Sequence, residues 1–203
     1  MKNFTDHIKS LSHDKIDYFL TNSKLDVLHE KIENSSILSG SFNPLHHGHT
    51  KLLDYCSNKF DRNKFYEISI SNVDKPNINI DDLISRLEKF QKYEKILITK
   101  SSKFVEKANL FPNSHFVIGY DTAIRVLDES YLAPDDSLDD LFEIIENKSC
   151  KFIVAGRANI NTKKFNNLSI NDVIYKYRSF FHIIQEKDFR EDISSTEKRR
   201  QDN

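Results

Sequence analysis

Three of the four glycines in this 203-residue chain each close a short apolar run. Gly40, Gly119 and Gly156 follow runs of four or five residues that carry isoleucine, leucine, valine or phenylalanine. Short apolar runs that end at a glycine are typical of buried strands followed by a turn. The full set of expected strands is 36–39, 65–70, 95–99, 115–118, 151–155 and 180–184.

Stretches with the spacing of amphipathic helices separate these strands. The clearest one, 81–93, begins with acidic residues and carries Leu83, Leu87 and Phe90 at helical spacing. The expected helices are 49–58, 81–93, 103–110, 122–127 and 138–147. Strands that alternate with helices predict an α/β fold, in which a mostly parallel sheet is covered by helices on both faces.

The first part of the chain has a less regular pattern. Residues 1–33 carry apolar side chains at irregular, helix-like spacing, among them Leu11, Ile16 and Leu20. We interpret them as an N-terminal helical extension that packs on the core. Residues 34–203 are then long enough to form one α/β domain with a core of its own.

Charge and hydropathy exclude several classes of protein. Lys and Arg number 30 against 31 Asp and Glu, so no basic excess points to nucleic-acid binding. No run approaches the roughly 20 apolar residues of a membrane span, and the N-terminus has no apolar signal core. Two cysteines, Cys56 and Cys150, are too few for a disulfide framework and are expected to be buried. We therefore expect a cytoplasmic protein, with homo-oligomerisation left open.

The most specific motif is GSFNPLHHGH at 40–49, which follows the first expected domain strand and opens a helix. A glycine at position 40 allows a phosphate to approach the backbone, and Gly48 allows close packing at the helix start. His46 and His49 are three residues apart and share a helix face, where two imidazoles can donate to phosphoryl oxygens. A metal-binding histidine loop and a purely structural turn are the alternatives.

A second phosphate-binding motif is predicted in DISSTEKRR at 192–200. Hydroxyl groups at a helix N-terminus form a cradle for a triphosphate, and Arg199 adds a permanently charged donor. The hydroxyl-bearing residues are Ser194, Ser195 and Thr196. The alternative is a capping box between Ser194 and Glu197, which explains only those two residues.

Two more strand ends carry polar candidates. Asp121 follows a strand, where it can accept from a ribose hydroxyl or merely cap the next helix, and Arg125 can reach a substrate phosphate or a surface carboxylate. Asn72 and Lys75 follow the strand at 65–70 and are placed to meet a second substrate. A solvated turn closed by a proline is the alternative for this last segment.

Both motifs resemble signatures of the nucleotidylyltransferase superfamily. His46, Gly48 and His49 match its HxGH motif, and residues 193–199 resemble its ISSTxIR motif, with Lys198 where an apolar residue is usual. More narrowly, the chain resembles nicotinamide-mononucleotide adenylyltransferase-like proteins of bacteria and fungi, over 37–199. The resemblance implies a Rossmann-like sheet with ATP across the strand ends.

The same resemblance implies a reaction of NAD biosynthesis. The phosphate of nicotinamide mononucleotide attacks the α-phosphorus of ATP, pyrophosphate leaves, and Mg²⁺ is carried by ATP without a protein metal site. The catalytic residues it implies are His46, His49 and Arg199. The ATP-binding residues are Gly40, Ser41, Phe42, His46, His49, Gly119, Asp121, Ser194, Ser195, Thr196 and Arg199. The acceptor-binding residues are Asn72, Lys75 and Arg125.

Two other functions remain open at this point. A cytidylyltransferase acting with CTP on a phosphorylated alcohol shares the HxGH chemistry. A nucleotide-binding sensor of the same fold, without turnover, is favoured only by Lys198 and a short last helix. Retention of both histidines and Arg199 argues against such a sensor, because mere binding does not need contacts to a transition state.

Overall fold

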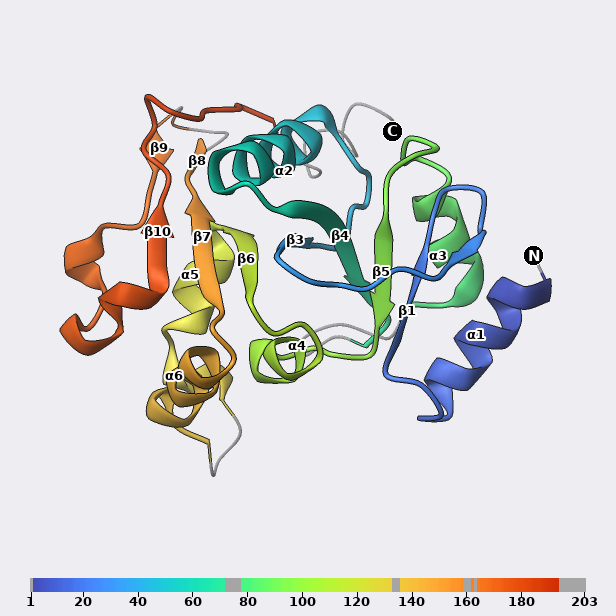
Figure 1. The fold of residues 1–203 in the computed structure, drawn as a ribbon. Coiled ribbons are helices and arrows are strands. Elements are labelled where there is room, and N and C mark those ends of the chain that lie inside the picture. Colours follow the sequence, from blue (N-terminus) through green and yellow to red (C-terminus); the bar gives the residue numbers. More distant parts are fainter. Residues whose placement is uncertain (1, 72–77, 133–135, 159–161, 163, 194–203) are drawn as a thin grey trace.

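The computed structural model describes residues 2–71, 78–132, 136–158, 162 and 164–193. Eight strands form one sheet in the order β10-β7-β6-β3-β4-β5-β1-β2 (Figure 1). These strands are β1 (Tyr18–Thr21), β2 (Val27–Leu28), β3 (Ser35–Ser39), β4 (Asn63–Ser69), β5 (Ile96–Thr99), β6 (Ser114–Gly119), β7 (Lys151–Ala155) and β10 (Phe181–Ile183). The short pair β8 (Arg157–Ala158) and β9 (Phe165–Asn166) is antiparallel and separate.

The pairs among β10, β7, β6, β3, β4 and β5 are all parallel. The order of the central strands reverses at β3, where the chain passes from β3 to β4 on one side and β6 lies on the other. In open α/β sheets, ligands bind outside the carboxyl ends of the strands at such a switch point. The predicted α/β fold with a mostly parallel, Rossmann-like sheet is confirmed.

Helices cover both faces of the sheet, as predicted. They are α1 (Lys2–Ser12), α2 (His47–Phe60), α3 (Ile80–Leu87), α4 (Phe104–Leu110), α5 (Tyr120–Val126) and α6 (Leu138–Asn147), with short 3₁₀ turns at Glu129–Tyr131, Ile170–Asp172 and Tyr175–Phe180. Apolar residues of α1, α2 and α3 pack in one core cluster, and those of α4, α5 and α6 pack in another. Adjacent strand residues point to opposite clusters, as Ile37 and Leu38 of β3 do.

The N-terminal segment differs from the prediction. Residues 2–12 are helical, but residues 18–21 and 27–28 are strands, so the expectation of a wholly helical extension is wrong. β1 pairs antiparallel with β5, with Leu20 opposite Leu97. The N–H and C=O groups of β5 that face away from β4 would otherwise form an open sheet edge. The backbone hydrogen bonds gained at that edge decide the structure of residues 18–28, which join the sheet in spite of the helix-like spacing of their apolar side chains.

Capping side chains explain where two helices begin. The Asn79 side chain accepts from the backbone N–H of Asp82, 2.8 Å away, and starts α3. Ser137 does the same for α6 through the N–H of Asp140. The helix α3 ends at Leu87, earlier than the predicted 93, although Phe90 is still buried. Among the described residues, no helix is both long and apolar enough to cross a membrane.

Both cysteines are buried and free, as expected. Cys56 lies in the cluster of α1, α2 and α3, and Cys150 lies in the cluster on the other face. Burial raises the pKa of Cys56 to about 12, so this thiol is protonated and packs as a small apolar group.

The buried His115 of β6 links stability to pH. Its ring packs edge-on against Phe60, and its Nδ1 atom has no hydrogen-bond partner. Burial, with Arg62 and Lys151 nearby, lowers the pKa of His115 to about 4. The unfolded chain takes up this proton near pH 6.5, so the unfolded state binds more protons between pH 6.5 and pH 4.

We therefore expect the free energy of unfolding to fall as pH drops from about 6.5 to 4, with His115 contributing up to about 2 kcal/mol. A His115→Gln variant should show a shallower pH dependence in urea titrations. The exposed His29→Gln variant is the matched control and should keep the wild-type slope. An identical slope in the His115 variant would show that its ring is not neutral in the folded state.

Candidate active site

The loop between β3 and α2 is anchored by Phe42. This residue has a φ of 43°, in the left-handed region, and its side chain is 1% exposed. Its ring packs edge-on against the rings of His49, Tyr66 and Phe90, at centroid distances of 5.1–5.4 Å. A Cβ at Gly40 would lie 3.1 Å from the Phe42 ring. The buried ring holds a strained backbone in place and thereby fixes the loop at the carboxyl end of β3.

His46 and His49 come together at the start of α2. His46 is the N-cap residue and is 8% exposed, while His49 lies in the first turn. Their rings are stacked, with centroids 3.6 Å apart and an interplanar angle of 19°. The predicted pairing of these two side chains on one helix face is present.

The protonation state of His49 follows from its surroundings. The backbone N–H of His46 donates to His49 Nδ1 across 3.2 Å, so Nδ1 is an acceptor and the ring proton is on Nε2. Burial and the neighbouring His46 lower the pKa of His49 to about 3. At neutral pH the ring is an uncharged donor through Nε2–H, as a phosphoryl oxygen would require.

The C-terminal segment passes over the same helix end. An added Cβ at Gly48 would lie 2.9 Å from Ile193 Cγ2 and 3.1 Å from His46 Nδ1. Glu191 accepts from Lys51 at 2.6 Å, and its other carboxylate oxygen lies 3.2 Å from His47 Nε2. Ile193 is the first residue of the second predicted motif, so the fold brings the beginning of that motif against the HxGH turn.

Gly48→Ala is expected to displace both neighbours of this glycine. Because His46 and Ile193 must each move by several tenths of an ångström, we expect the rate of a reaction at this site to fall by about ten- to a hundredfold. The free energy of unfolding should change far less, because the substitution favours the helix. Steady-state kinetics measures the rate, and urea titration of the same preparation measures the free energy of unfolding. Wild-type turnover would contradict this packing.

The remaining sequence-predicted residues fall into two groups. Ser194, Ser195, Thr196 and Arg199, together with Asn72 and Lys75, lie outside the described residues. Gly119, Asp121 and Arg125 are described and lie at the start of α5. Gly119 is the N-cap, and an added Cβ there would meet nothing within 4 Å. Open space therefore adjoins the carboxyl end of β6.

Asp121 does not cap α5, contrary to one of the two interpretations of this residue. The helix begins at Tyr120 without a side-chain cap, and Asp121 instead forms an ion pair with Arg157. The carboxylate is half-exposed. Arg125 lies one turn further on, with its guanidinium 6.0 Å from the centre of the Tyr131 ring.

A cavity of about 500 Å³ adjoins the end of β3 and the first residues of the loop that leads to the HxGH motif, Gly40 and Ser41. It is lined by the ends of β3 and β4 and by residues of α4, α5 and α6. Its hydroxyl-bearing residues are Ser39, Ser41, Ser69, Ser71, Ser102, Thr122 and Tyr131. Its apolar wall includes Ile78, Phe104, Val126, Leu132, Leu141 and Ile144, and Arg125 also faces it. The cavity can therefore take a ligand that is partly apolar and partly polar.

The floor of this cavity is formed by residues that lie outside the sequence motifs. Glu67 of β4 is 1% exposed and pairs with Lys107 of α4 at 2.7 Å, while Thr99 donates to its other oxygen at 2.6 Å. Glu67 interrupts the apolar run of β4 and points to the same core cluster as Phe65. A charged residue in a central strand was the available signal, because unpaired carboxylates are rarely fully buried.

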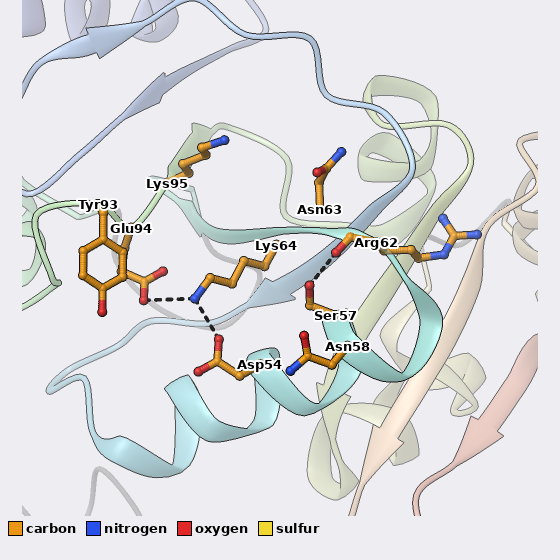
Figure 2. A pocket seen from close by; sticks show the side chains of 9 residues that line it. All are labelled: Asp54, Ser57, Asn58, Arg62, Asn63, Lys64, Tyr93, Glu94 and Lys95. Carbon is orange, nitrogen blue, oxygen red and sulfur yellow. Dashed lines mark hydrogen bonds and ion pairs between the residues drawn. The ribbon is translucent and has the colours of Figure 1, made fainter.

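A second pocket lies at the amino ends of the strands, opposite to the carboxyl ends that line the first cavity (Figure 2). It lies between α2 and the amino ends of β4 and β5, and three of its charged residues, Asp54, Lys64 and Glu94, interact with one another. Lys64 contacts Asp54 at 2.7 Å and the buried Glu94 at 3.4 Å (Figure 2). Burial raises the pKa of Glu94. This pocket is remote from the HxGH turn, which lies at the carboxyl ends of the strands.

Comparison with known proteins identifies the family. A family model of cytidylyltransferase-like proteins matches residues 37–201. The chain belongs to the cytidylyltransferase-like family. No curated protein compared with the chain matches it.

Membership of the cytidylyltransferase-like family confirms the resemblance to the nucleotidylyltransferase superfamily. It implies nucleotidyltransferase activity for the chain. The matched range begins within β3 and includes both predicted phosphate-binding motifs. The family leaves the nucleotide and the acceptor undefined, and both are therefore subjects of the proposal below.

Proposed function

We propose that this cytidylyltransferase-like protein transfers AMP from ATP to the phosphate of nicotinamide mononucleotide and releases pyrophosphate. The observation that carries the proposal is the stacked His46–His49 pair, in which His49 is a neutral donor at the start of a helix. The cavity lined by Gly40 and Ser41 of the same loop supports the presence of a second, partly apolar substrate.

In this proposal the protein positions the reactants and stabilises developing charge. The acceptor phosphate attacks the α-phosphorus in line, and the bond to the leaving pyrophosphate breaks as the new bond forms. His49 Nε2–H donates to a phosphoryl oxygen whose negative charge grows in the transition state. The positive end of the α2 helix dipole lies at His47, next to the histidine pair, and favours the phosphates.

The other substrate contacts are proposed from the sequence motifs. Ser194, Ser195, Thr196 and Arg199 would hold the β- and γ-phosphates, and the contact of Ile193 with the α2 start supports a position near the HxGH turn. Asp121 would contact the ribose, and Asn72, Lys75 and Arg125 the acceptor. Mg²⁺ enters as part of the nucleotide substrate. The described residues contain no group of three or more metal-ligating side chains.

The test is pyrophosphate release from the purified protein with Mg²⁺. ATP and CTP are supplied separately, each with and without nicotinamide mononucleotide, and the dinucleotide product is identified by mass spectrometry. We expect release only with ATP and the mononucleotide together. Release with CTP and a phosphorylated alcohol such as phosphocholine, but not with the first pair, would replace the proposal with the cytidylyltransferase alternative.

A further inference from the structure

The floor of the cavity carries an ion pair at a position that an apolar residue would suit. Glu67 and Lys107 are 1% and 6% exposed, and both line the cavity. Lys107 donates to Glu67 Oε2 at 2.7 Å, and its Nζ atom lies 5.2 Å from the centre of the Phe104 ring. Thr99 donates to Glu67 Oε1 at 2.6 Å. The pair is therefore held rigidly on two elements of the scaffold.

Stability alone does not account for such a pair. Taking both charges out of water costs about as much as their attraction returns, and apolar residues of similar volume often stabilise a core as well or better. The surrounding residues of this core cluster, such as Phe65 and Leu97, are apolar. A ligand that needs both members of the pair explains why the charges lie at the cavity.

The pair offers complementary groups side by side. A carboxylate accepts more than two hydrogen bonds, and an ammonium group donates three, so each group keeps capacity beyond the contacts within the pair. A primary carboxamide has the matching pattern, because its N–H₂ donates and its C=O accepts. A carboxylate in the same place would be a third buried charge beside Glu67, and juxtaposed like charges cost several kcal/mol.

We infer that the Glu67–Lys107 pair makes the acceptor site select a neutral amide over a carboxylate. This inference rests on the proposed function, because it assigns the cavity to the acceptor. Glu67 and Lys107 are specificity-determining residues and are not part of the stacked histidine pair. Among the other charged residues that line the cavity, Lys103 pairs with Asp136 at 3.1 Å, Glu106 accepts from the backbone N–H of Lys103 at 3.2 Å, and Asp140 is bound to Ser137. Arg125 also lines the cavity, and the proposed function assigns it to the acceptor phosphate.

Calorimetric binding of two compounds tests the inference. Nicotinamide mononucleotide carries the amide, and nicotinate mononucleotide is the same molecule with a carboxylate. We expect the wild-type protein to bind the amide at least about tenfold more tightly. In Glu67→Gln the unpaired Lys107 favours the carboxylate, so the preference should disappear or invert. Glu143→Gln makes the same charge change at an exposed position of α6 and should keep the wild-type ratio.

A second variant covers the case in which Glu67→Gln does not fold. The double variant Glu67→Gln/Lys107→Gln leaves no unpaired charge, and we expect it to bind the two compounds within about threefold of each other. Equal binding by the wild type, or an unchanged ratio in the folded variants, would overturn the inference and leave the proposed function intact. Failure of the wild type to bind either compound would overturn the proposed acceptor, and the inference with it.

Discussion

His49→Ala should reduce the rate of nucleotidyl transfer by about a hundred- to a thousandfold, the effect of removing one preorganised donor to a developing oxyanion. The dissociation constant for ATP should change much less, because the lost hydrogen bond strengthens mainly in the transition state. Pyrophosphate release under saturating substrates measures the rate, and calorimetry measures nucleotide binding.

The control for this variant is His13→Ala, the same substitution at an exposed histidine that follows α1. It should keep the wild-type rate. Because the pKa of His49 is about 3, the wild-type rate should show no ionisation of His49 between pH 5 and pH 8. Full activity of His49→Ala, with the fold intact, would remove His49 from the catalytic role.

Lys107→Met should lower the free energy of unfolding by about 3–5 kcal/mol, because it leaves Glu67 buried without its cation. Replacing both partners removes the unpaired charge. The double variant Glu67→Leu/Lys107→Met is therefore expected to be much closer to the wild type than the single variant. Urea denaturation of four proteins, the wild type, Glu67→Leu, Lys107→Met and the double variant, completes a double-mutant cycle and measures the coupling between the two side chains.

Lys92→Met is the matched control, since this lysine is exposed in the loop after α3. Its effect on the free energy of unfolding should stay within about 0.5 kcal/mol. A Lys107→Met variant that loses less than about 1 kcal/mol would show that the ion pair is weak and that water or another group compensates Glu67.

Apolar runs and helical spacing predicted the strands and helices well wherever the residues of one element are enough to decide its structure. The runs before Gly40, Gly119 and Gly156 are the strands β3, β6 and β7, and the alternation with helices gave the parallel sheet. The HxGH motif was also readable, because three-residue spacing on one helix turn places two imidazoles on one face. Family membership agrees with this interpretation.

The same local reasoning failed at the N-terminus and at the cavity floor. Residues 18–28 have no strong pattern of their own, and they become strands because β5 presents an edge that needs a partner. Glu67 lies 32 residues before Thr99 and 40 residues before Lys107 in the sequence. Their spacing along the chain carries no signal, since only strand register and helix packing bring them together.

By itself, the sequence determined the class of fold, the order of its main elements and the histidine turn at the end of β3. Each of these depends on interactions within one turn or one strand, which residue spacing records directly. Only the tertiary structure decided that His49 is a neutral donor, that Ile193 lies against Gly48, and that an ion pair forms the cavity floor. Burial and contacts between distant segments set these properties, and local residue patterns predict neither of them.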